Sequence, residues 1–407
     1  MKRVVCVCLA VVCLAFAFSC SKKSGKAVDQ TDKSGKVEVK VGLLCIGDEN
    51  DQGYSYNFVQ GRKEATERLK KEGINVSWVT KYNIKEDSSC ADANIEAAEE
   101  GCKIIINNSY GHEDYMLEVA PKYPDVQFVS CTNQKSHISP MRNVHNAFAS
   151  IYEGRYVAGV VAGMKLNEMI EKGVIRPNQA VIGYVGAYSF AEVISGFSAY
   201  YLGARSVCPS VTMKVTFVGS WGDATAEADA AASLADKGAV MISQHSDNTT
   251  PATTAQRKNV FHTGYNADMT KVAPSASLIS TRIDWSVYFY EIIKAFVEGR
   301  EIPKDWCKGM KDGAVVMTAL NKSIAAPGTE AAMNKAISDI SSGKLQVFDL
   351  SKFTIGGTIP ENKIMYDSFA AVKKDAIVDG AFRESYTQSA PYFVGKIDGI
   401  EWLNEVY

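Results

Sequence analysis

The sequence predicts an α/β protein made of two similarly wound lobes, each built on a parallel sheet, with a cleft where the lobes meet. Segments typical of strands and helices alternate from residue 37 onward. The strand-like segments, such as 102–106, are continuously apolar, which is typical of parallel strands buried on both faces. The order helix, glycine, apolar strand and polar loop in residues 92–118 recurs in residues 223–256. This single long-range recurrence indicates two lobes rather than a solenoid, although ordinary βα units also resemble one another by chance.

Residues 1–19 are typical of a secretory signal peptide. Lys2 and Arg3 precede an apolar run over residues 4–18, which is shorter than the roughly 20 residues of a membrane-spanning helix. Ser19 and Cys20 follow this run, so we expect cleavage before Cys20 and lipidation of its thiol. The alternative is simple cleavage that releases a periplasmic protein without an anchor.

Residues 20–36 are expected to form a flexible tether. After Cys20 the segment consists mainly of Ser, Gly, Lys and Asp. Such a segment buries too little apolar surface to offset the entropy lost when it becomes ordered. A tether behind a lipidated cysteine would let a globular body work close to the membrane.

Composition and charge argue against several classes of function. The 407 residues carry a formal net charge of -2, so no basic surface predicts nucleic acid as a partner. The motifs of serine hydrolases, P-loop NTPases, dinucleotide-binding enzymes and zinc proteases do not occur in the sequence, and we expect no enzyme. The five histidines lack the spacing of metal ligands, so we expect neither a metal nor a cofactor. The cysteines beyond residue 36 show no C-x-x-C spacing, and we expect them to be mostly free.

The first lobe is predicted over residues 37–148. Its expected helices are amphipathic, and its expected strands are rich in β-branched residues: strands at 37–46, 76–79 and 102–106, with helices at 55–71 and 91–100. The chain is expected to return to this lobe over residues 286–320, beginning with a helix near 287–298.

The second lobe is predicted over residues 149–285. Ser150 and Glu153 match a capping box, which places the start of a helix there. Small residues in that helix would let it pack closely on a neighbour: Ala158, Gly159, Ala162 and Gly163. Residues 321–407 are expected to form a C-terminal helix and a tail that wraps the lobes.

The polar loops that follow the strands are the expected binding site. In parallel sheets, ligands bind beyond the carboxyl ends of the strands, where helix N-termini present free N–H groups. The loops in question are 48–56, 107–114, 187–192, 220–223, 244–250 and 264–268.

Several of these stretches resemble a known family. The most specific are 152–163 (YEGRYVAGVVAG) and 182–205 (IGYVGAYSFAEVISGFSAYYLGAR), joined by 47–56, 220–223, 238–247 and 264–269. They are similar to the basic membrane protein family of ABC-transporter substrate-binding lipoproteins, whose best-understood members bind purine nucleosides. The resemblance is strongest to a branch implicated in binding adenine or related purines. It implies a type I periplasmic-binding-protein fold, in which two Rossmann-like lobes share a hinge and a central cleft. It also implies a small-molecule ligand that is handed to an ABC permease, by a protein that is lipid-anchored at the membrane and faces the periplasm or exterior.

A purine pocket needs aromatic faces for the ring and carboxylates or amides for its nitrogens and exocyclic groups. By the resemblance, Tyr54 and Trp221 fall where the family places its two aromatic residues, and Asp51 matches the acid just before the first. The other candidates from the loops are Tyr110, Asp114 (or His112 in its place), Gln244, Asp247, Asn266 and Asp268. The alternative is that Tyr54 and Trp221 are packed aromatic residues and that Asp48, Asp51 and Asp223 cap helices.

The resemblance also bears on the size of the ligand. Nucleoside-binding members carry a lysine just after the second crossover, where it reaches the ribose, and no lysine occurs in residues 278–285. We therefore expect a free purine base to bind more tightly than its nucleoside, unless waters or Asp284 serve the ribose. Two further functions remain open: a receptor for another flat heterocycle such as riboflavin, and a surface lipoprotein that acts as an adhesin.

Overall fold

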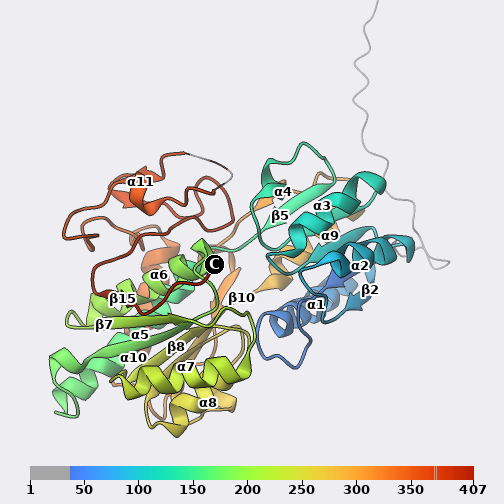
Figure 1. The fold of residues 1–407 in the computed structure, drawn as a ribbon. Coiled ribbons are helices and arrows are strands. Elements are labelled where there is room, and N and C mark those ends of the chain that lie inside the picture. The colour runs from blue at the N-terminus through green and yellow to red at the C-terminus, as the bar shows by residue number, and fades with distance from the viewer. Residues whose placement is uncertain (1–36, 371, 373) are drawn as a thin grey trace, which may run out of the picture.

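The structure is a computed structural model that describes residues 37–370, 372 and 374–407. The signal peptide, the lipidated Cys20 and the tether, all predicted above, lie outside the described residues. Figure 1 shows two α/β lobes side by side, with the C-terminal tail over the second. Within the described ranges, no helix is both long and apolar enough to cross a membrane.

The first lobe is built on a six-stranded parallel sheet in the order β11-β5-β4-β3-β1-β2. Each strand pairs in parallel with its neighbours. The strands are β1 (Val37–Leu44), β2 (Ile74–Lys81), β3 (Ile104–Asn107), β4 (Gln127–Ser130), β5 (Val144–Ala147) and β11 (Asp305–Trp306).

Helices cover both faces of this sheet, as the continuous apolar strands predicted. Val41 and Leu43 of β1 pack with one pair of helices, α1 (Tyr54–Lys71) and α9 (Trp285–Val297). The next residue, Leu44, packs with the opposite pair, α2 (Ser88–Glu99) and α3 (His112–Val119). Short helices complete the lobe: η1 (Ala120–Lys122) and α4 (Lys135–Ile138).

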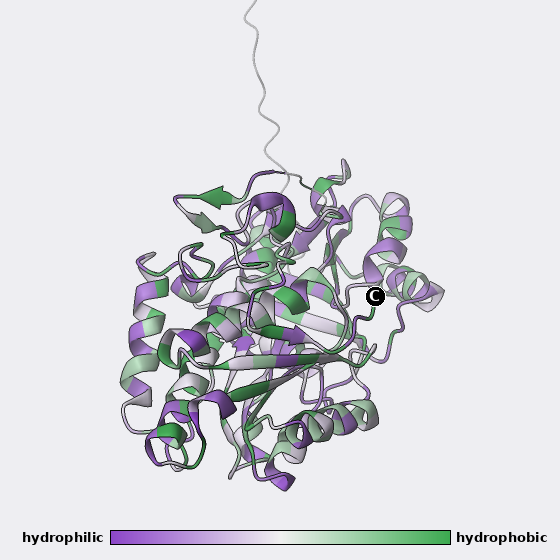
Figure 2. Cartoon of the chain, turned by 60° about the vertical axis from the view of Figure 1, so that its left-hand side comes forward, coloured by the Kyte–Doolittle hydropathy of each residue, from purple (hydrophilic) through white to green (hydrophobic). Residues whose placement is uncertain are grey.

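The second lobe is built on a seven-stranded sheet in the order β12-β10-β9-β8-β6-β7-β15. Its parallel strands are β6 (Val181–Gly186), β7 (Thr212–Phe217), β8 (Met241–His245), β9 (Phe261–Tyr265), β10 (Ser277–Ile283) and β15 (Ile400–Trp402), and β12 (Val315–Met317) runs antiparallel to β10. The helices are α5 (Ile151–Glu171), α6 (Ala191–Val207), α7 (Ala224–Asp236), α8 (Thr250–Arg257) and α10 (Thr329–Ser341), with short η2 (Pro177–Gln179), η3 (Met269–Lys271) and η4 (Met310–Asp312). In Figure 2, hydrophobic colouring runs along the inner strands, whereas hydrophilic colouring recurs on the outer helices and loops.

Helices α5 and α6 pack closely through glycines. The small residues of α5 predicted this close packing. A Cβ on Gly159 would lie 2.0 Å from the carbonyl oxygen of Tyr200, and one on Gly203 would lie 2.0 Å from that of Tyr156. The expected start of α5 is confirmed, since Ser150 is its N-cap residue, but the expected capping box is wrong because the Ser150 side chain caps no amide. The Glu153 carboxylate instead accepts a hydrogen bond of 2.6 Å from the amide of Met310 on another crossing segment.

The chain crosses between the lobes before α5, between β10 and α9, and between β11 and β12. The third crossing comes earlier than expected. We expected residues 286–320 to belong to the first lobe, but the structure places β12 in the second sheet, where Thr281–Ile283 faces Val315–Met317. A three-residue antiparallel strand carries too little pattern to be recognised in the sequence.

The C-terminal tail packs mainly on the second lobe and also reaches the first. It holds α11 (Asn362–Met365) and the hairpin of β13 (Ile377–Val378) and β14 (Ala381–Phe382). Its aromatic side chains join the core of the second lobe: Phe348, Tyr366, Phe382, Tyr392 and Phe393. At the first lobe, the amide of Ser389 donates to Asp305 Oδ2 at 2.7 Å, and Asn146 Nδ2 donates to Ser389 Oγ at 2.8 Å.

Candidate ligand-binding site

A small cavity lies between the lobes, at the carboxyl ends of both sheets where the polar loops were expected to meet. Its volume is about 20 Å³. The first lobe contributes Ile46, Tyr54, Ser109, Tyr110, Cys131 and Thr132, and the second contributes Glu192, Trp221, His245, Asp247 and Tyr265. We call this space the inner cavity.

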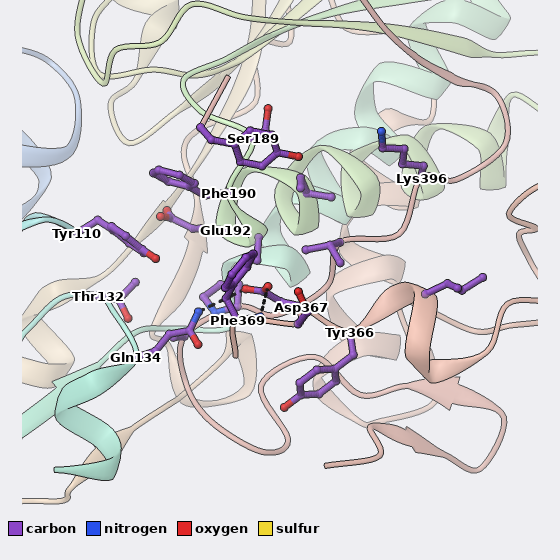
Figure 3. Close-up of a pocket in the computed structure, with 18 of the residues that line it drawn as sticks. Tyr110, Thr132, Gln134, Ser189, Phe190, Glu192, Tyr366, Asp367, Phe369 and Lys396 are labelled. Atoms are coloured by element: carbon purple, nitrogen blue, oxygen red, sulfur yellow. Dashed lines mark hydrogen bonds between the residues drawn. The ribbon is translucent and has the colours of Figure 1, made fainter. Parts of the chain in front are cut away.

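A larger chamber of about 740 Å³ adjoins the inner cavity. Three residues line both spaces: Tyr110, Thr132 and Glu192. The C-terminal tail forms the far wall with Tyr366, Asp367 and Phe369, which Figure 3 shows opposite Tyr110 and Glu192. We call this space the outer chamber.

Tyr54 lies in the wall of the inner cavity at the first turn of α1. Its phenol donates a hydrogen bond of 3.1 Å to the carbonyl oxygen of Cys131. Its ring meets Phe58 edge-on, with 4.9 Å between centroids. Tyr54 therefore packs on the core of the first lobe and also borders the cavity.

Asp247 joins the two lobes. Its Oδ1 accepts a hydrogen bond of 3.1 Å from the amide of Tyr54, at the N-terminus of α1 in the other lobe. The same oxygen accepts one of 3.3 Å from Asn266 Nδ2. Burial raises the pKa of Asp247 well above its usual range, and the nearby carboxylates of Asp51, Glu227 and Glu192 raise it further.

Four aromatic rings contact one another in a row that joins the two lobes. Tyr110 of the first lobe stacks on Phe190 of the second, with centroids 5.1 Å apart. Phe190 stacks in turn on Tyr188 at 5.0 Å, and Tyr188 meets the edge of Trp221 at 5.1 Å. Stacking of this kind contributes about 0.5–1.5 kcal/mol per pair beyond the area buried. The Tyr110–Phe190 contact therefore favours the closed arrangement of the lobes.

Arg155 of α5 lies buried behind the second-lobe wall. Its guanidinium donates to the carbonyl oxygen of Gln244 at 2.8 Å and to His245 Nδ1 at 3.1 Å. It also lies 3.6 Å from the centroid of the Tyr265 ring. On the other side of the imidazole, His245 Nε2 is 3.1 Å from Glu192 Oε1. Burial lowers the pKa of His245, and the charge of Arg155 lowers it further.

Of the predicted site residues, the structure brings Tyr54, Tyr110, Trp221 and Asp247 to the inner cavity. Asn266 lies one layer behind them through its hydrogen bond to Asp247. Gln244 is fully buried and donates to the carbonyl oxygen of Asn248 at 2.7 Å, so it shapes the loop that carries Asp247.

The remaining candidates have other partners. Asp51 accepts hydrogen bonds from the amides of Gly53 and Tyr56 at 2.8 and 2.9 Å, which fits a helix-capping role. Asp268 accepts one from the amide of Thr270 at 3.1 Å. Asp114 is exposed and pairs with Lys135 at 2.5 Å. None of these three lines the inner cavity within the described residues.

Helix capping and burial also account for Asp223, His112 and the stretch that lacks a lysine. Asp223 caps α7 through the amide of Thr225 at 3.0 Å. His112 is buried, with Nε2 2.8 Å from the carbonyl oxygen of Ile84. In the stretch without a lysine, Ile283 is fully buried and Asp284 caps α9 through the amide of Ser286 at 3.0 Å. These side chains therefore offer nothing to a group in the cleft.

Seven residues of the inner cavity were not among the predicted ligand-binding residues: Ile46, Ser109, Cys131, Thr132, Glu192, His245 and Tyr265. Most of them follow strands in loops that were recognised. Cys131 and Thr132 directly follow β4, and no polar loop was predicted after this short strand. Among the described residues, no group of three or more His, Cys, Asp or Glu side chains is arranged to hold a metal ion. All six cysteines that the structure describes are free.

Comparison with known proteins agrees with this architecture. The chain has a Brucella abortus (strain 2308) relative named as a purine-binding protein, 35% identical over 280 residues that cover 69% of this chain and 75% of the relative. A Haloferax volcanii protein, named provisionally as an ABC transporter glucose-binding protein, is 30% identical over 295 residues that cover 71% and 70% of the two chains. The solved structure of an ABC transporter solute-binding protein from Aeropyrum pernix K1 matches with a TM-score of 0.61 and 17% identity, over 76% of this chain and 93% of that one.

The likeness to the Aeropyrum pernix K1 structure concerns the fold. The fold is the type I periplasmic-binding-protein fold, which the family resemblance implied. The family model for "ABC transporter substrate-binding protein PnrA-like" matches residues 38–347. This chain therefore belongs to that family, and it is the substrate-binding component of an ABC transporter.

Proposed function

We propose that the chain binds a purine base between its lobes and delivers it to the permease of an ABC importer. One observation supports the proposal above all: the inner cavity combines aromatic faces with two carboxyl groups. Tyr54, Tyr110 and Trp221 provide the faces, and Glu192 and Asp247 provide the carboxyl groups. A flat heterocycle with several N–H groups suits both kinds of wall. The Brucella relative, named as purine-binding, points to the same class of ligand.

Binding requires the lobes to move. A volume of about 20 Å³ holds little more than one water molecule. A purine ring therefore enters only when the walls separate, and the three crossings between the lobes provide the hinge. A ligand that contacts both walls stabilises the closed form, which is the form that we propose the permease receives.

A free base fits this site better than a nucleoside. Asp284 and Ile283, which stand where a lysine would reach the ribose, point to a helix cap and to the core. A buried ribose would then leave hydroxyl groups unpaired, at a cost of about 1–3 kcal/mol for each group.

A sugar is the second candidate, because the Haloferax relative is named provisionally as glucose-binding. Aromatic faces and carboxylates also suit a pyranose ring, which stacks by its C–H face and donates through its hydroxyls. Riboflavin and other flat heterocycles fit the aromatic walls for the same reason as a purine. An adhesin would need no closed cavity of this kind.

Two further proposals concern the cellular location of the chain and the fate of its ligand. The chain works outside the cytoplasm as part of its transporter, and we propose that lipidated Cys20 holds it at the membrane. We also propose that the site binds and releases its ligand unchanged, with no enzymatic step.

Mass spectrometry of small molecules that co-purify with the protein tests the proposed ligand first. Calorimetric titration with adenine, adenosine and glucose then ranks the candidates. We expect adenine to bind most tightly. A ten-fold preference for adenosine, which corresponds to about 1.4 kcal/mol, would contradict the choice of base, and binding of glucose alone would contradict the purine.

A further inference from the structure

Glu192 stands where the inner cavity meets the outer chamber. It belongs to the first turn of α6, at the N-terminal end of that helix. Its side chain is only 12% exposed. Its side chain lines both spaces, together with Tyr110 and Thr132.

The orientation of Glu192 is set by the two residues behind it. Arg155 can only donate hydrogen bonds, so His245 Nδ1, which lies 3.1 Å from it, must accept. The neutral imidazole then carries its proton on Nε2, which donates to Glu192 Oε1 at 3.1 Å. This fixes one carboxylate oxygen, and among the described residues no side chain or amide donates to Oε2.

Tyr265 gives a second indication of a polar ligand at the same wall. Its ring borders the inner cavity and its side chain is 1% exposed. Its hydroxyl has no hydrogen-bond partner among the described residues. A buried hydroxyl without a partner is uncommon in a folded protein, and a ligand in the cavity would supply the missing partner.

We propose that Glu192 selects the ligand by accepting a hydrogen bond from a ring N–H that a free purine base carries and an N-alkylated purine lacks. Arg155 and His245 act as positioning residues, because they hold the carboxylate with one oxygen free. The inference rests on the proposed function, since it names the group of a purine that the site reads. A base with a substituent on that nitrogen would bring carbon against a carboxylate and leave its charge unpaired.

Glu192→Gln tests the proposal directly, because Arg155 and His245 remain in place behind the new side chain. The His245 Nε2–H group would still donate to the amide oxygen, so the NH₂ group of the new side chain would face the cavity. A donor would then meet the ring N–H, although size and shape are unchanged. Glu192→Asp keeps the charge, and the exposed Glu298→Gln serves as a control outside both cavities.

The experiment is calorimetric titration of the full chain and these variants with adenine, 9-methyladenine and 7-methyladenine. We expect wild type to bind adenine at least about ten-fold more tightly than one of the methylated bases, as a hydrogen bond to a charged group predicts. We expect Glu192→Gln to bring that ratio close to one, while Glu192→Asp and Glu298→Gln keep a clear preference for adenine. Thermal unfolding of each variant shows that it is folded.

Two results would overturn the inference: wild type that binds adenine and both methylated bases equally, or Glu192→Gln that keeps the wild-type ratio. A chain that binds none of the three purines overturns the proposed function as well. Binding of adenine without the expected ratio overturns only the role of Glu192.

Discussion

A Cβ atom built on Gly53 would lie 2.4 Å from the Cα atom of Asp247. The two residues belong to different lobes, so the backbone before α1 touches the backbone after β8 across the cleft. The hydrogen bond from the amide of Tyr54 to Asp247 Oδ1 lies beside this contact. Glycine is therefore required at residue 53 for the closed arrangement, and for reasons of space rather than of backbone conformation.

Gly53→Ala should weaken ligand binding by about ten-fold or more, because the added methyl group keeps the lobes apart at the point where they close. Each lobe should keep its fold, since the clash arises only between them. Calorimetry measures the affinity, and small-angle X-ray scattering with ligand should show a larger radius of gyration than wild type. Gly222→Ala is the matched control, because a Cβ there meets no atom within 4 Å. Equal closure of the two variants would contradict this prediction.

Tyr54→Ala and Trp221→Ala should each weaken purine binding by roughly 1–3 kcal/mol, the range found when a base loses an aromatic partner. Tyr54→Phe should bind more like wild type, because only the hydrogen bond to the carbonyl oxygen of Cys131 is lost. Tyr386→Ala removes an exposed aromatic ring away from both cavities and serves as the control. If both alanine variants bind like wild type in calorimetry, the ligand binds elsewhere.

The stability of the protein should fall as the pH rises from about 4.5 to about 7. Glu384 of the tail is 4% exposed, and burial raises its pKa from 4.5 to about 7. In this window the unfolded chain has lost the proton that the folded protein still holds, so each increase in pH favours unfolding. The contribution of Glu384 is fully present below pH 4.5 and is lost above pH 7, and it amounts to at most about 3 kcal/mol.

Glu384→Gln should reduce this fall, because the amide stays neutral at every pH. Urea unfolding at a series of pH values measures the effect, with the exposed Glu401→Gln as the control. The same slope in Glu384→Gln and in wild type would show that the carboxyl group is not protonated in the folded protein.

Cys20→Ala should move the protein from the detergent phase to the aqueous phase on Triton X-114 partition. A lipid chain contributes about 0.8 kcal/mol for each buried CH₂ group, so a protein without the lipid should leave the detergent phase. Cys45→Ala, which changes a buried cysteine of the first lobe, should leave the partition unchanged. Detergent partition of the Cys20→Ala protein would contradict lipid anchoring.

The sequence predicted the fold well because its signals are long and repeated. Continuous apolar strands indicated sheets covered on both faces, and Val41 and Leu44 do pack on opposite layers. The glycines of α5 indicated close helix packing, which Gly159 shows. The short β12 was missed, because three residues without a periodic pattern could equally belong to a loop.

The sequence predicted most of the loops around the inner cavity, but not which of their side chains line it. Asp51 and Tyr54 belong to the same turn, yet the carboxylate of Asp51 faces the amides of α1 while Tyr54 borders the cavity. Which way a loop residue points depends on hydrogen bonds that the sequence does not display. Glu192 illustrates the same limit, since its role depends on Arg155 and His245, which are distant in sequence and adjacent only after folding.

The last strand of the chain has a consequence for solubility. β15 pairs in parallel with β7, with Ile400 beside Met213. It covers the edge of β7, which would otherwise be the open edge of the second sheet. Exposed edges with unpaired N–H and C=O groups are templates for intermolecular pairing and aggregation. A chain shortened by residues 400–407 would expose β7, and we expect it to aggregate with increasing concentration in light scattering. β15 thus limits self-association through β7.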